Sequence, residues 1–87
     1  MQDFPRWTDD ELDRWLREQA ASHGLEFVAE KRPDLEGSAS DVWFAALKDA
    51  GGLALVGTEA LSERWAKNAL AQVLDPLTEV DWQRLVR

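Results

Sequence analysis

The chain of 87 residues contains no cysteine. Disulfide bonds, thiolate metal sites, cysteine nucleophiles and iron–sulfur clusters are therefore excluded, and the absence fits a reducing compartment. Long apolar runs are also missing, because the longest one, from Val42 to Leu47, is far too short to cross a bilayer. The start of the chain has no apolar leader segment. We therefore predict a cytoplasmic protein that does not bind membranes.

Basic residues are scarce relative to acidic ones, with 10 Lys and Arg against 17 Asp and Glu and a net charge of −7. The excess of acids is greatest in residues 1–36. A surface of this sign repels phosphate backbones, so we predict no direct binding of nucleic acid. The same excess raises an alternative function, in which the protein is an acidic decoy or inhibitor that occupies a basic, nucleic-acid-type groove on a partner protein.

Residue patterns that carry chemistry are sparse. His23 is the only histidine, and its position before Gly24, at the end of a predicted helix, favours helix capping over acid–base catalysis. The glycines of 51–57 lack the order of a P-loop or a dinucleotide site, and the acids of 9–13 lack EF-hand spacing. We therefore predict no catalytic residue, cofactor or metal, and a small enzyme that uses His23 is the least favoured alternative.

Three helix starts can be read from capping residues. Thr8 with Glu11 and Thr78 with Asp81 form capping boxes, and Ser62 is a suitable N-cap before an apolar stretch. The pattern predicts one helix that ends at Gly24, a second over 63–74 and a short third one that ends near residue 86.

The remaining segments predict a sheet. Strands are expected at 25–31 and 53–56, with a polar loop at 33–40. The segment Asp41–Lys48 is ambiguous, because part of its apolar pattern also fits a helix, but a strand there completes a three-stranded antiparallel meander, which is a better sheet than two strands. We therefore predict a single α+β domain over residues 1–87, with the order α-β-β-β-α-α and two main helices packed on the sheet.

Five tryptophans are many for a domain of this size, which can hardly bury all of them. Trp15 and Trp65 fall on apolar helix stripes and are expected in the core, Trp65 together with Ala69, Leu70, Val73 and Leu74. The residues predicted to bind a partner are Trp82, Leu85, Val86, Trp7 and Trp43. The sequence thus favours a non-catalytic protein-interaction module or small accessory subunit, whose partner is another protein or, in a homodimer, a second copy.

Overall fold

The computed structural model describes residues 4–33 and 41–86, so the predicted polar loop lies, apart from Pro33, outside the described residues. The chain order is α-β-β-β-α-α, as predicted from the sequence, preceded by one turn of 3-10 helix. The elements are η1 (Phe4–Arg6), α1 (Asp9–Ser22), β1 (Glu26–Pro33), β2 (Asp41–Lys48), β3 (Ala54–Ala60), α2 (Glu63–Leu74) and α3 (Glu79–Leu85).

The three strands form one antiparallel sheet in the order β1-β2-β3. Asp49 stabilises the turn of the β2–β3 hairpin. Its Oδ1 accepts hydrogen bonds from the backbone N–H groups of Gly51 and Leu53, both at 2.9 Å. Gly52 takes a φ of +84° in this turn, a conformation that favours glycine. The prediction that Asp41–Lys48 is a strand is confirmed.

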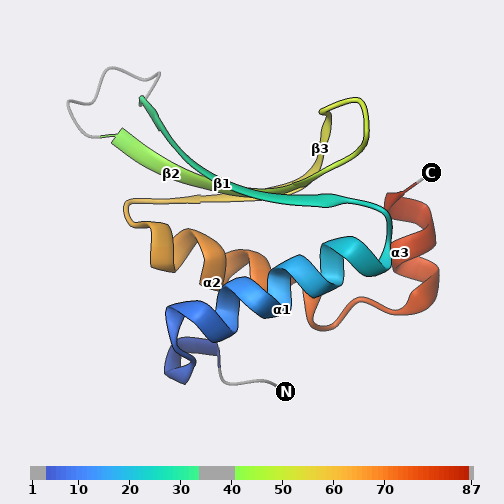
Figure 1. Cartoon of the computed structure of the whole chain (residues 1–87), viewed down its shortest axis with the longest axis horizontal. Coiled ribbons are helices and arrows are strands. Elements are labelled where there is room, and N and C mark those ends of the chain that lie inside the picture. The colour runs from blue at the N-terminus through green and yellow to red at the C-terminus, as the bar shows by residue number, and fades with distance from the viewer. Residues whose placement is uncertain (1–3, 34–40, 87) are drawn as a thin grey trace.

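The helices α1 and α2 pack on one face of the sheet, and α3 lies beside the end of α1 (Figure 1). Because side chains alternate along a strand, Ala45 and Leu47 of β2 point to the helices and join the core, with Trp43 packed against it. Phe44 and Ala46 point to the opposite face. The fully buried large side chains of the core are Phe4, Leu12, Leu16, Leu47, Leu70 and Leu74.

The predicted caps are present. Thr8 and Glu11 form a reciprocal capping box, as do Thr78 and Asp81, and Ser62 Oγ accepts a hydrogen bond from the backbone N–H of residue 65. The backbone N–H of each capping threonine lowers the pKa of the acid that it bonds, Glu11 in α1 and Asp81 in α3. These local bonds fix where the helices begin, independently of how they pack.

The predicted apolar face of α2 needs correction. Trp65 is 60% exposed and Val73 is 44% exposed, whereas Ala66, Leu70 and Leu74 are buried. The prediction that Trp65 lies in the core is therefore wrong. The apolar residues of α2 extend around more of the helix than one face, and the row that fits against the sheet and α1 is the row of Ala66, Leu70 and Leu74.

Candidate interaction surface

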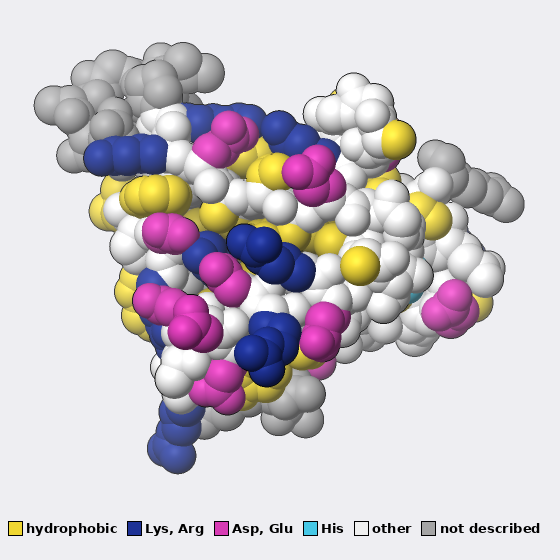
Figure 2. Space-filling model, viewed as in Figure 1, with side chains coloured by type: hydrophobic (Ala, Val, Ile, Leu, Met, Phe, Trp, Pro, Cys, Tyr) yellow, Lys and Arg dark blue, Asp and Glu magenta, His cyan; other side chains and the backbone are white. Residues whose placement is uncertain are grey.

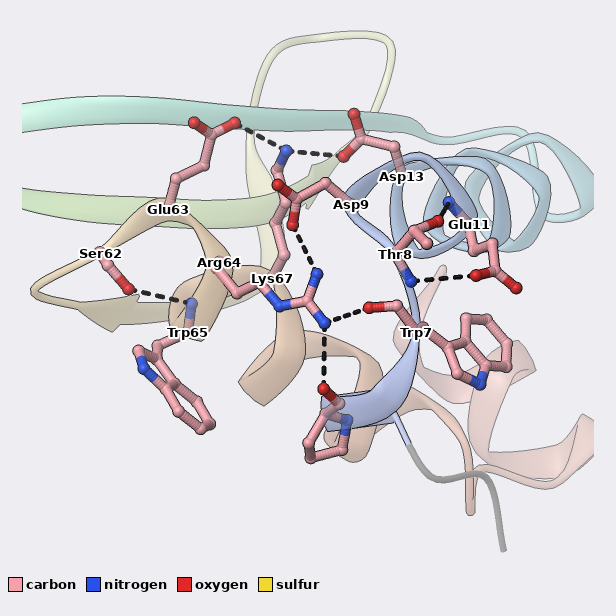
Figure 3. A network of polar contacts seen from close by, with 11 residues as sticks. Trp7, Thr8, Asp9, Glu11, Asp13, Ser62, Glu63, Arg64, Trp65 and Lys67 are labelled. Atoms are coloured by element: carbon pink, nitrogen blue, oxygen red, sulfur yellow. Dashed lines mark hydrogen bonds and ion pairs between the residues drawn. The ribbon is translucent and has the colours of Figure 1, made fainter.

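An ion-pair network joins α1 to α2 (Figure 3). Lys67 Nζ lies 2.7 Å from Asp13 Oδ1 and 2.6 Å from Glu63 Oε1, and the Lys67 side chain is only 8% exposed. Burial alone would lower the pKa of Lys67, but the hydrogen bonds to Asp13 and Glu63 outweigh it and the pKa is raised. Lys67 is therefore held as a cation between two carboxylates.

Arg64 extends this network toward the start of the chain. Its guanidinium donates to Asp9 Oδ1 at 2.5 Å, to the carbonyl oxygen of Pro5 at 3.1 Å and to the carbonyl oxygen of Trp7. The network thus ties η1, α1 and α2 together. Its acids serve as partners of two cations, so the cluster is explained by its structural role.

His23 is the C-cap residue of α1, and its Nδ1 lies 2.9 Å from the carbonyl oxygen of Gln19. The imidazole stacks on the indole of Trp82, with ring centroids 3.8 Å apart and planes 8° apart. This geometry agrees with the predicted capping role and adds a packing role that the sequence did not reveal. Within residues 4–33 and 41–86, no group of three or more His, Cys, Asp or Glu side chains is placed to hold a metal ion.

The five residues predicted to bind a partner do not form one exposed surface. Trp82 belongs to the core at 4% exposure, because the short α3 docks its indole against His23 and the end of α1. Trp7, Trp43 and Leu85 are half-buried and pack against the core cluster. Only Val86, at 37%, is exposed. Trp82 therefore offers almost no area to a partner.

Three of the exposed large apolar side chains lie along α2 or just before it, whereas Leu53, Val80 and Val86 lie elsewhere. Leu61 is 79% exposed, Trp65 is 60% exposed and Val73 is 44% exposed, and the half-buried Ala69 lies between the last two. Trp65, Ala69 and Val73 are spaced by four and form one row along α2, and Leu61 lies just before the helix begins. We call this row the α2 strip.

The α2 strip lies on the side of α2 that faces away from α1. Arg64 and Lys67 reach toward α1, and Figure 3 shows the indole of Trp65 pointing away from their network. At 100° per residue, Ala69 is nearly opposite Lys67 and Arg64 on the helix. The charged side chains of α2, which are Glu63, Arg64 and Lys67, therefore all lie off the strip.

The outer edge of β3 lies on the α2 side of the molecule, because α2 packs mainly on β3 and β2 and α1 packs on β1. β3 is an outer strand of the sheet, and its only charged residue is Glu59. Thr58 Oγ1 donates a hydrogen bond to the carbonyl oxygen of Ala66 at 2.7 Å, which fixes α2 beneath β3. Among the described residues no further strand pairs with the outer side of β3, so the outward side of α2 is next to a strand edge that carries almost no charge. This edge, residues 54–60, is called the β3 edge.

The sheet face opposite the helices is covered by its own side chains. The Phe44 ring lies so close over Gly57 that a Cβ there would be 2.7 Å from Phe44 Cζ. The Arg32 guanidinium stacks on the Phe44 ring at 4.0 Å and is bound by Glu30, which also pairs with Lys48 at 3.8 Å. This face is therefore less open to a partner than the α2 strip.

Comparisons with family models, with curated proteins and with solved structures each found no match to this chain. Among the described residues, no helix has both the length and the apolar character needed to span a membrane.

Proposed function

We propose that the protein is a non-catalytic protein-interaction module that presents the α2 strip and the β3 edge to a protein partner. The observation that carries the proposal is the exposure of Trp65, at 60%, within an uncharged row on a chain of net charge −7. Exposed tryptophans with apolar neighbours are typical of binding hot spots. An uncharged row also avoids the cost of removing charges from water when a partner binds.

The acidic decoy is the less supported function. Asp9 and Asp13 are bound by the cations of α2, and Glu11 is used in the capping box of α1. Arg14 and Arg17 are interspersed with the exposed acids of α1, and Figure 2 shows basic and acidic side chains mixed over this part of the surface. A decoy for a phosphate-binding groove would need a surface of one sign.

The proposed function is tested with immobilised full-length protein and its Trp65→Ser variant. We expect the wild type to retain protein that the variant does not retain, either another chain or added soluble copies of itself, while the two baits unfold at similar urea concentrations. The matched control is Ala21→Ser, a small change on the exposed side of α1. Retention that is the same for wild type and Trp65→Ser would contradict the proposal.

A further inference from the structure

We propose that the partner of the α2 strip and the β3 edge is a second copy of the same chain, bound about a two-fold axis that passes near Gly57 and Ala69. In this dimer the two β3 strands pair antiparallel to form a six-stranded sheet, and the two α2 helices pack side by side beneath it. The inference rests on the proposed function and specifies its partner.

The β3 edge is suited to pairing with itself. An antiparallel strand pair is self-complementary about a two-fold axis, and Gly57 is the middle residue of Ala54–Ala60. In a register centred on Gly57, Glu59 faces the region of Leu55 of the second copy, where β3 has a bulge opposite Leu47 and Lys48, and does not face the other Glu59. Like charges directly opposite one another would destabilise the pair. This register avoids that repulsion between two chains of net charge −7.

The α2 strip has the same symmetry. Ala69 lies four residues from Trp65 and four from Val73, or about 6 Å along the helix in each direction. Antiparallel packing centred on Ala69 therefore places each Trp65 against the Val73 of the second copy. The small Ala69 side chains meet at the axis, where they allow close approach of the helices.

One axis can pass through both centres. Thr58 bonds Ala66, and Gly57 is one residue, or about 3.3 Å, back along the strand. That distance corresponds to about two residues of helix at 1.5 Å each, which leads from Ala66 to the region of Asn68 and Ala69. The centre of the β3 edge therefore lies above the centre of the α2 strip.

The spacing between the two helices also fits. α2 packs mainly on β3 and β2, and we place its axis midway between them. Strands are about 4.8 Å apart, so the two-fold axis lies about 2.4 Å outside β3 and about 4.8 Å from the α2 axis. The two α2 helices would then be about 9.6 Å apart, within the 8–10 Å found for packed helices. Strand pairing and helix packing are thus satisfied together.

A single extended peptide fits the surface less well. It could add to the β3 edge, but it would not cover the α2 strip, and Trp65 would stay exposed. The strip alone is also small, because 60% of an indole's area amounts to about 90–150 Å², whereas a stable interface buries about 800 Å² on each partner. A second copy supplies both a strand and a helix.

The test is sedimentation equilibrium of the full chain from micromolar to millimolar concentration, with Ala69→Arg and, as control, Ala21→Arg. Both substitutions place arginine on a helix, but only the first places two cations at the axis. We expect wild type and Ala21→Arg to dimerise, and Ala69→Arg to dissociate at least tenfold more readily. Wild-type protein that is monomeric throughout would overturn the dimer. The proposed function would then still stand if the Trp65-dependent bait retained a different chain.

Cross-linking tests the geometry without relying on a disruptive variant. Because the chain has no cysteine, Ala69→Cys carries a single thiol. Mild oxidation should convert Ala69→Cys to a covalent dimer much faster than it converts Ala21→Cys, since a disulfide requires Cα atoms within about 7 Å. Equal rates would exclude the helix pairing. Amide exchange of residues 54–60 should slow as protein concentration rises, and exchange that does not depend on concentration would exclude the strand pairing.

Discussion

The two flanks of the molecule differ sharply in charge. The outer side of α1 carries the exposed charged residues Asp10, Arg14, Arg17 and Glu18, and the outer strand on this side, β1, contains Glu26, Glu30, Lys31 and Arg32 and ends in Pro33. The α2 flank carries the apolar α2 strip and the β3 edge, which has one charged residue. Charged residues and proline on an outer strand are a common protection against pairing with other chains. The same two-layer architecture thus has one charged edge and one edge that carries a single charged residue and a β-bulge at Leu55.

Both flanks share one hydrophobic core. Trp82→Ala tests how far they depend on it, because it empties a site that is 4% exposed and removes the stack on His23. We expect the free energy of unfolding to fall by about 3–5 kcal/mol in urea titrations. Amide exchange should quicken in both α1 and α2. A loss below about 1 kcal/mol, or exchange that changes in one helix alone, would show that the flanks are separately stabilised.

Removal of the buried cation between α1 and α2 should have the next largest effect. Lys67→Met leaves Asp13 and Glu63 facing each other without a counter-charge, and we expect a loss of about 2 kcal/mol. The expected loss is smaller than for a fully buried pair, because the two acids are 32% and 45% exposed. Arg17→Met, on the exposed side of α1, is the control and should change stability by less than about 0.5 kcal/mol. If Lys67→Met and Arg17→Met lowered the free energy of unfolding equally, the ion-pair network would not stabilise the fold more than a surface charge does.

The same lysine predicts a dependence on alkaline pH. The pKa of Lys67 is raised in the folded state, so its contribution is complete below the pKa of an unfolded lysine, about 10.4, and is lost as the pH rises through the folded value. We therefore expect the stability difference between wild type and Lys67→Met to narrow when urea titrations are taken from pH 9 to pH 11.5. A difference that stays constant over this range would contradict the prediction.

The smallest effect on stability is expected on the uncharged flank. Trp65→Ala should change the free energy of unfolding by about 1 kcal/mol or less, because most of the indole is already in water. The measurement is a urea titration at a protein concentration low enough to keep the chain monomeric. A loss of 3 kcal/mol or more would place Trp65 in the core and would remove the basis of the α2 strip.

Local signals in the sequence predicted the helix starts well, because each cap depends on residues only three positions apart. They did not predict which face of α2 is buried. Seven of its residues are apolar, namely Trp65, Ala66, Ala69, Leu70, Ala71, Val73 and Leu74. The choice among them is made by distant partners, such as Asp13 on α1 and the sheet. The width of this apolar arc was a readable sign that part of it would remain exposed.

The strand order was also predicted, and it could have indicated which edge of the sheet belongs to the candidate interaction surface. In a three-stranded meander the first and third strands are the edges, and their charges can be compared in the sequence alone. The burial of Trp82 could not be found in this way. It depends on where the turn after α2 directs the short α3, and that direction is set by contacts with the end of α1.

The stack of His23 on Trp82 also gives the molecule an optical reporter. α3 is shorter than a helix that is stable alone, so it is helical only while it is docked at this stack. Contact with an imidazole alters indole emission, and Trp82 is the tryptophan that makes this contact. Release of the last helix would separate the two rings and change the emission of this one tryptophan. Fluorescence can therefore follow a local opening that unfolding curves of the whole chain would average out.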